Sequence, residues 1–301
     1  MAIVLTASLL VPLAGGGSAT GAAATVSYYE QGAWGQALYL QGEQAGLAGA
    51  EGIAILDFGR PASNGKSDGT DSFAGTFLSF AAISQGVENY VMGYYDYAPA
   101  DTTLDVAVGT NDSCGVGQPC GSVVCGCPDE PGNYVTWGQE LAGVVKRLGA
   151  WSAGFASENG YTDTVRVVAA DDAEPAFDPG YDNTYDLMRG YARSVGGSYP
   201  PMVDYGSADP GIWSKDQLLQ VANGFAPNVA MPQMYDVGQV AEWADLVAYA
   251  KATRGEYLTV FGVLSDAAGS NPPQDAVDET LRAVSAITGQ GTVRWVSTIT
   301  H

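Results

Sequence analysis

The chain has 301 residues, of which 46% are hydrophobic and 10% aromatic, so it can bury a large core and does not have the composition of a disordered protein. Its formal net charge is −21, with 12 Lys and Arg against 33 Asp and Glu. Such a surface repels phosphate backbones and anionic membranes, so neither nucleic acid nor a membrane is an expected partner.

The beginning of the chain resembles a secretory signal. Residues 1–15 are mostly apolar, and small residues follow up to an Ala-x-Ala cleavage site that ends at Ala24. The run lacks a positively charged start and is too short to cross a bilayer. We therefore expect a signal peptide at 1–24, a mature domain at 25–301, and a secreted, extracellular protein.

Helical and strand-like patterns alternate along the rest of the chain. The first helix is expected over 28–48 because apolar residues recur there at mixed helical spacing. Short apolar runs predict eight strands, at 52–59, 90–95, 104–109, 165–170, 201–204, 228–231, 257–264 and 293–299. Amphipathic stretches predict further helices at 71–85, 135–158, 181–195, 215–223, 237–253 and 274–288.

This alternation predicts an α/β fold with a parallel sheet, specifically a single (β/α)8 TIM-type barrel. Two departures from the ideal repeat are expected. The link between the second and third predicted strands is too short for a helix, and no helix follows the last strand, so the N-terminal helix takes the place of the last one. An open doubly wound sheet is the alternative, but the count is eight and no glycine-rich dinucleotide turn follows the first predicted strand.

Four cysteines lie close together in one irregular segment: Cys114, Cys120, Cys125 and Cys127. In an exported protein this pattern predicts two disulfides that pin a loop. A zinc site is the competing interpretation, although the paired Cys-x₂-Cys units of structural zinc sites are missing. A bridge between Cys125 and Cys127 is the least expected, and the sequence leaves open how the other pairs form. We expect no cofactor and no metal.

Histidine chemistry is nearly excluded, because the only histidine in the sequence is His301. A Ser-His-Asp triad, a Cys-His dyad or a histidine-based metal centre would need that terminal residue. Acid–base chemistry must therefore use carboxylates, tyrosines or lysines.

The carboxyl ends of the predicted strands collect carboxylates, amides and phenols. Since active sites of barrels form at these ends, we expect one mouth to contain Asp57, Asn111, Asp172, Glu174, Asp204, Gln233 and Tyr235. Crowded carboxylates cannot all ionise, so one can keep its proton and serve as a general acid in glycosidic bond cleavage. Trp213, in the loop after the fifth predicted strand, is a candidate for stacking on a sugar. Asp57 and Asp204 could instead simply cap loops.

Some of these motifs resemble known glycoside hydrolases. Asp172-Ala-Glu174, with an Asp that closes the first predicted strand, resembles the barrel of glycoside hydrolase family 25 lysozymes. The segment 233–236, Gln-Met-Tyr-Asp, resembles both that family's Gln-x-Tyr and the Met-x-Tyr-Asp of family 18 chitinases. Segments 55–59, 106–111 and 171–178 are similar to secreted bacterial glycoside-hydrolase-like barrels of unestablished activity.

The resemblance implies roles for individual residues. Glu174 would be the general acid/base and Asp172 its electrostatic partner, while Tyr235 would steady the reacting sugar. Asp57 and Gln233 would position the substrate. The sequence departs from the family 18 pattern at Val168 and Ala170, where that family carries further acidic residues.

We therefore expect a monomeric secreted glycoside hydrolase that acts on a carbohydrate substrate such as peptidoglycan or chitin. The alternative is a catalytically inactive barrel that acts as a carbohydrate-binding or cell-surface module. A peptidase with a carboxylate mechanism ranks last.

Overall fold

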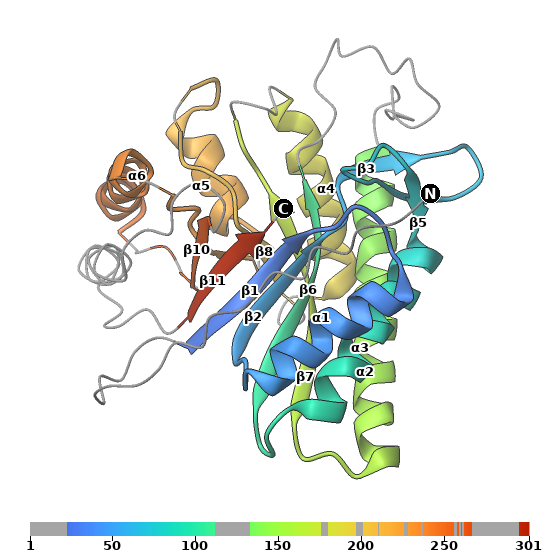
Figure 1. Cartoon of the computed structure of the whole chain (residues 1–301). Coiled ribbons are helices and arrows are strands. Elements are labelled where there is room, and N and C mark those ends of the chain that lie inside the picture. Colours follow the sequence, from blue (N-terminus) through green and yellow to red (C-terminus); the bar gives the residue numbers. More distant parts are fainter. Residues whose placement is uncertain are drawn as a thin grey trace, which may run out of the picture.

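The computed structural model describes most of the chain after the predicted signal. The described residues are 23–111, 133–175, 180–196, 201–209, 211–225, 228–235, 237–255, 258, 260, 262–266 and 295–300. They form an α/β structure in which a parallel sheet is flanked by helices (Figure 1).

The main sheet has eight strands in the described residues, and neighbouring strands all pair in parallel. The strands are β1 (Ala23–Tyr29), β2 (Gly52–Asp57), β6 (Thr103–Asn111), β7 (Thr164–Asp172), β8 (Met202–Asp204), β9 (Val229–Ala230), β10 (Val263–Asp266) and β11 (Trp295–Thr300). Their order is β10-β11-β1-β2-β6-β7-β8-β9. Two further parallel bridges, Ala230↔Val260 and Gln233↔Leu264, link the segments at the two outer strands.

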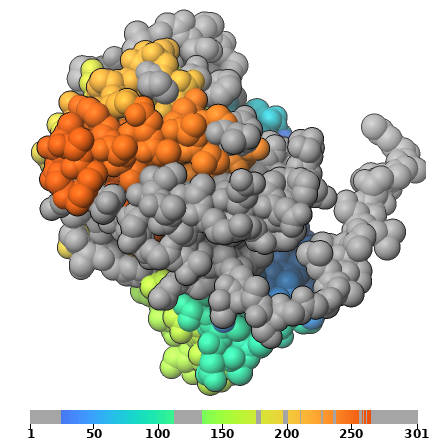
Figure 2. Space-filling model, turned by 90° about the vertical axis from the view of Figure 1, so that its left-hand side faces the viewer, coloured from blue at the N-terminus to red at the C-terminus, as the bar shows by residue number. Residues whose placement is uncertain are grey.

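Six helices are described: α1 (Gly35–Leu47), α2 (Phe80–Tyr97), α3 (Asn133–Asn159), α4 (Tyr181–Val195), α5 (Lys215–Asn223) and α6 (Val237–Arg254). Helices α1, α2 and α3 lie to the right of the strands in Figure 1, and α5 and α6 lie to the left. Helix α6 forms a large part of the surface in Figure 2. Local sequence sets several ends: a capping box of Ser214 and Gln217 begins α5, and Gly196, at φ 89°, ends α4.

A second, small sheet lies between β2 and α2 in the chain. Its strands β3 (Arg60–Ser63), β4 (Asp68–Asp71) and β5 (Phe77–Ser79) pair in antiparallel fashion. This three-stranded insertion follows the carboxyl end of β2 directly.

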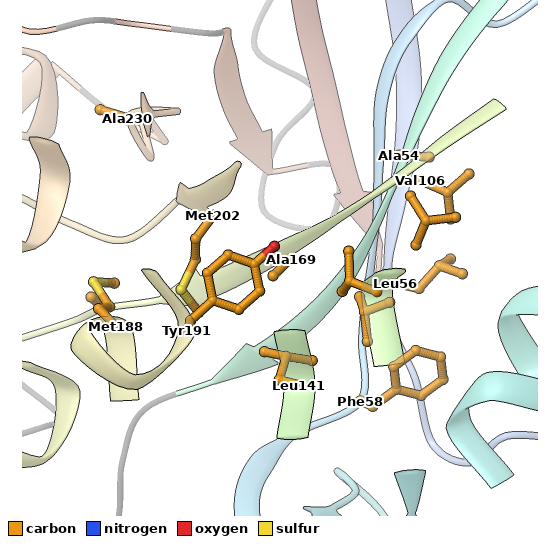
Figure 3. Packing of buried hydrophobic residues seen from close by; sticks show 14 of the residues in the cluster. Ala54, Leu56, Phe58, Val106, Leu141, Ala169, Met188, Tyr191, Met202 and Ala230 are labelled. Atoms are coloured by element: carbon orange, nitrogen blue, oxygen red, sulfur yellow. The ribbon is translucent and has the colours of Figure 1, made fainter. Parts of the chain in front are cut away.

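Both faces of the parallel sheet are buried, which explains why its strands read as continuous apolar runs. Alternate residues such as Ala54, Leu56 and Val106 pack toward the helices, in the layer that Figure 3 shows. The intervening residues form a separate inner cluster that joins strands from both halves of the sheet: Ile53, Ile55, Ala107, Val168, Ala170, Val203, Tyr205, Met231 and Leu264.

Much of the predicted order of elements is confirmed. The predicted strands at 52–59, 104–109, 165–170, 201–204 and 228–231 correspond to β2, β6, β7, β8 and β9. The last two predicted strands overlap the described β10 and β11, and the helices α3 to α6 lie where the pattern placed them. The predicted helix at 274–288 lies outside the described residues.

Two predictions at the beginning of the chain are wrong, and a third is wrong only at its start. The run 90–95 belongs to α2 and is not a strand; it reads as strand-like because α2 is buried on several sides, with Tyr90, Val91, Tyr94 and Tyr95 all in the core. The predicted helix at 71–85 contains β5 and the start of α2 instead. The predicted helix at 28–48 contains α1, but its first two residues belong to β1, a strand that the sequence interpretation missed.

These corrections also remove the first expected departure from the repeat. Helix α2 fills the link that had been read as too short for one. Helix α1 follows β1 and packs on α2. It is therefore the helix of the first β/α unit and does not replace a last helix. The predicted signal lies outside the described residues up to residue 22, and β1 begins at Ala23.

Candidate active site

The carboxyl ends of the parallel strands are aligned with one another. Tyr29 at the end of β1 is the register partner of Asp57 in β2, and Asn111 in β6 is the partner of Asp172 in β7. All four alternate with residues that pack toward the helices, so their side chains extend the inner cluster beyond its apolar part. Gly109 provides the space: a Cβ there would lie 2.9 Å from the Cα of Asp57.

Asp57 lies at the centre of this end of the sheet and is fully buried. Its Oδ1 accepts a hydrogen bond from the backbone N–H of Gly59 at 2.8 Å, its Oδ2 lies 2.7 Å from the hydroxyl of Tyr205, and the Asn111 side chain hydrogen-bonds it as well. Burial raises the pKa of Asp57 to about 7, although these three hydrogen bonds favour the carboxylate. The nearby charge of Glu174 raises this pKa further.

The hydroxyl of Tyr205 is placed to serve either protonation state of Asp57. The Tyr205 hydroxyl lies within hydrogen-bonding distance of two oxygens, Oδ2 of Asp57 and, at 3.0 Å, the carbonyl oxygen of Thr110. A phenol has one proton and cannot donate to both. When Asp57 is ionised, Tyr205 donates to it; when Asp57 is protonated, it can donate to Tyr205, which then donates to Thr110.

Asp172 is also buried and lies within a group of phenols. The hydroxyl of Tyr29 donates to its Oδ2 at 3.3 Å, and Tyr29 hydrogen-bonds Tyr235. Burial is the largest cause that raises the pKa of both phenols, and the charge of Asp172 is the next. Both phenols therefore keep their protons and remain neutral at any physiological pH.

Glu174 follows β7 and remains partly exposed. Burial raises its pKa, while a hydrogen bond with the Gln233 side chain lowers it. Gln233 is held in turn: its Nε2 donates to the hydroxyl of Tyr235 at 3.1 Å, and its Oε1 accepts from Nε2 of Gln239 at 3.1 Å. The Oε1 of Gln239 accepts from the backbone N–H of Tyr235 at 2.6 Å, which closes this network.

The structure brings together six of the predicted site residues: Asp57, Asn111, Asp172, Glu174, Gln233 and Tyr235. A partly exposed acid with a raised pKa thus lies beside buried carboxyl groups and neutral donors. This arrangement can deliver a proton at one position and stabilise positive charge at another.

The chain matches no protein-family model, and no curated protein matches it.

Asp204 and Trp213 do not join this group. Asp204 alternates with Val203 and Tyr205 of the inner cluster, so it faces the helices; it is buried, its Oδ1 accepts from the N–H of Gly206 at 3.1 Å, and burial raises its pKa to about 7. The hydrogen bond from Gly206 is the loop cap that the sequence analysis gave as the alternative role of Asp204. Trp213 is 2% exposed and lies edge-on to Tyr181, with the ring centroids 5.4 Å apart, so its faces are not open to a sugar.

Three residues of the site were missed by the sequence interpretation. Tyr29 was assigned to a helix, because β1 faces inward with Thr25 and Ser27, whose hydroxyls hydrogen-bond the backbone of β2 and hide the apolar pattern of a strand. Tyr205 stands one residue after Asp204, and the alternation of the strand could have identified it as the inward neighbour. Gln239 lies in α6 and carries no recognisable signal.

Other predictions fall outside this region or outside the described residues. The four cysteines lie in the segment 112–132, which the structure does not describe. Two surface cavities, of about 570 Å³ at the β3–β4 turn and about 220 Å³ between α5 and α6, lie elsewhere on the molecule. Within the described ranges, no cluster of three or more His, Cys, Asp or Glu side chains is arranged to hold a metal ion. Among the described helices, none combines the length and apolar character that a membrane span requires.

Proposed function

We propose that the eight strands close into a (β/α)8 barrel and that the protein is a secreted glycoside hydrolase acting on an extracellular polysaccharide of the peptidoglycan or chitin type. The bridges between the two outer strands and the shared inner cluster support closure. The resemblance of Asp172-Ala-Glu174 to lysozyme barrels supports the choice of reaction and the class of substrate.

The observation that carries the proposal is the environment of Glu174. Among the site carboxyl groups that the structure describes, Glu174 is partly exposed while Asp57 and Asp172 are buried, and burial raises its pKa so that it keeps a proton closer to neutral pH than an ordinary glutamate does. A general acid in glycoside hydrolysis needs both properties, because it must reach the leaving oxygen and must be protonated when it does.

The surrounding residues fit supporting roles. Glu174 gives its proton to the glycosidic oxygen as the bond to the anomeric carbon breaks, and Asp172 supplies negative charge near the oxocarbenium centre. Tyr235, fixed by Gln233 and Tyr29, steadies the sugar or its acetamido group. Water then adds to the anomeric carbon and loses its proton to a carboxylate.

Replacement of Glu174 tests this assignment. Glu174→Gln should lower the rate of hydrolysis of peptidoglycan or chitin about 10²–10⁴-fold, because the amide cannot transfer a proton. Reducing-end release should be measured for wild type, for Glu174→Gln, and for Glu158→Gln as a control that makes the same change at an exposed position of α3. Equal turnover by wild type and Glu174→Gln would remove Glu174 from the mechanism.

A specific observation also favours the non-catalytic alternative. Val168 and Ala170 are fully buried in the inner cluster, at positions where the family 18 pattern has further acids. A barrel that binds carbohydrate without cleaving it would retain the polar network and show glycan binding with no product.

A further inference from the structure

The inserted sheet β3–β5 presents a tight turn at the carboxyl end of the parallel strands. This turn, Ser72–Thr76, is closed by Ser72 N–H donating to the carbonyl of Thr76 at 3.0 Å and by Gly75 N–H donating to the carbonyl of Ser72 at 2.7 Å. Gly75 has φ +70°, a conformation that favours glycine. The turn therefore has a defined shape, and Phe73 lies within it.

Three contacts fix the inserted sheet to the rest of the molecule. Gly59, at φ +93°, lies so close to β4 that a Cβ would come within 2.1 Å of the carbonyl oxygen of Asp71. The hydroxyl of Thr70 donates to the carbonyl of Phe58 at 2.7 Å, and the buried Nε1 of Trp137 in α3 donates to the carbonyl of Gly69 at 2.8 Å. The turn is thus held in a fixed position over the end of β2.

Phe73 connects this turn to the acidic group. Its ring centroid lies 4.8 Å from that of Tyr29 in an edge-to-face contact, with 64° between the ring planes. Tyr29 is the residue whose hydroxyl donates to Asp172. Yet Phe73 is 41% exposed, so one part of its ring rests on the site while another part remains open to solvent.

We propose that Phe73 is a stacking platform for a sugar ring at the rim of the acidic site. The inference rests on the proposed function, because it assumes that the site takes carbohydrate. The C–H faces of sugars bind to aromatic rings, and a ring that is already immobilised loses little conformational entropy on binding. An isolated exposed phenylalanine would need no explanation, but this one is anchored by a rigid turn and touches a site tyrosine.

Calorimetric binding to chito-oligosaccharides and to soluble peptidoglycan fragments tests the proposal, with Glu174→Gln as the background so that bound glycan is not consumed. In that background Phe73→Ala should weaken binding about 10-fold, and Phe73→Tyr should restore it. Tyr97→Ala is the matched control, since Tyr97 is 42% exposed at the far end of α2, and it should leave binding unchanged. Circular dichroism of each variant verifies folding.

The outcomes separate this proposal from the proposed function. Equal binding by the Phe73→Ala and Tyr97→Ala variants overturns the platform, whatever the wild type hydrolyses. Weakened binding by Phe73→Ala together with no hydrolysis by wild type supports the platform and overturns the hydrolase. A failure of the Glu174→Gln protein and of the wild type to bind either glycan overturns both.

Discussion

Strands β6 and β7 carry two pairs of polar side chains on the same face of the sheet, and the two pairs are built in opposite ways. Near the strand starts, Asp105 and Arg166 are register partners; near the ends, Asn111 and Asp172 are. The pairs lie roughly 20 Å apart along the strands. Each places a buried carboxyl group inside the molecule, so the partners, rather than the burial, distinguish the two ends.

At the strand starts the partner is a cation. Arg166 makes two hydrogen bonds to Asp105, at 2.5 and 2.7 Å, in a bidentate ion pair. Burial nevertheless raises the pKa of Asp105 to about 6, and the guanidinium lowers it by less than burial raises it. A charge held in this way is fixed and serves the fold.

At the strand ends Asn111 hydrogen-bonds Asp57 of the neighbouring strand β2. The partners of Asp57 are all neutral: an N–H, a phenol and an amide. Neutral partners allow the carboxyl group to gain or lose its proton without breaking an ion pair. The difference between the ends is therefore the difference between a structural charge and a site where protons can move.

The largest expected effect is a loss of stability when the ion pair at the strand starts is removed. Arg166→Met should lower the free energy of unfolding by about 1–3 kcal/mol, because it leaves a buried carboxylate without its donors. Lys215→Met is the control, since it breaks the ion pair with Asp245, whose side chain is 61% exposed, and should cost less than about 1 kcal/mol. Urea denaturation at neutral pH measures both. Equal losses would mean that Asp105 is stabilised by something other than Arg166.

The sequence predicted the acidic group better than the elements that carry it. Asp172 and Glu174 were identified because residues two apart share a face of a strand, an argument that does not depend on the rest of the fold. Tyr29 was missed because its strand faces inward with hydroxyls that bond to the backbone of β2, so the apolar alternation that reveals a strand was absent.

Trp213 is a residue whose exposure the sequence predicted wrongly. Its position in a loop suggested exposure, but its ring is buried against Tyr181 of α4. Phe73 lies in a turn as well and is exposed. Only the tertiary contacts of each loop decide which of the two rings is open, so sequence alone could not rank them.

Asp→Asn should raise the free energy of unfolding more at the strand ends than at the strand starts, and this is the next largest prediction. Asp57 has an ordinary pKa of 3.8 and a folded pKa of about 7, so the unfolded chain loses a proton that the folded chain keeps as the pH rises from about 4 to about 7. Stability from this group is therefore full below about pH 4 and is lost as the pH rises through 7. Asp57→Asn removes the loss and should raise the free energy of unfolding at pH 8 by about 1–2 kcal/mol relative to wild type, with little change at pH 4.

Asp105→Asn provides the contrast. It breaks the ion pair with Arg166, but burial also raises the pKa of Asp105 to about 6, so removal of the charge offsets part of that loss. Asp105→Asn should therefore raise the free energy of unfolding at pH 8 by less than Asp57→Asn does. Urea denaturation of wild type and both variants across pH 4–8 measures the difference between each variant and wild type, which removes the shared contributions of other buried acids. A loss of stability in Asp57→Asn at pH 8 would show that Asp57 is charged and structural, and the distinction between the two ends would disappear.

The smallest effect tests where the proton of Asp57 lies. Tyr205→Phe should lower the free energy of unfolding by about 0.5–1.5 kcal/mol, because the carbonyl of Thr110 and Oδ2 of Asp57 both lose the phenol between them. A protonated carboxyl group and the amide of asparagine both donate to that phenol. The cost of Tyr205→Phe at pH 5 should therefore be the same in wild type and in the Asp57→Asn background, within about 0.5 kcal/mol. A clearly smaller cost in the Asp57→Asn background would mean that Tyr205 donates to an ionised Asp57, since the amide cannot reproduce that bond if its N–H₂ faces the phenol.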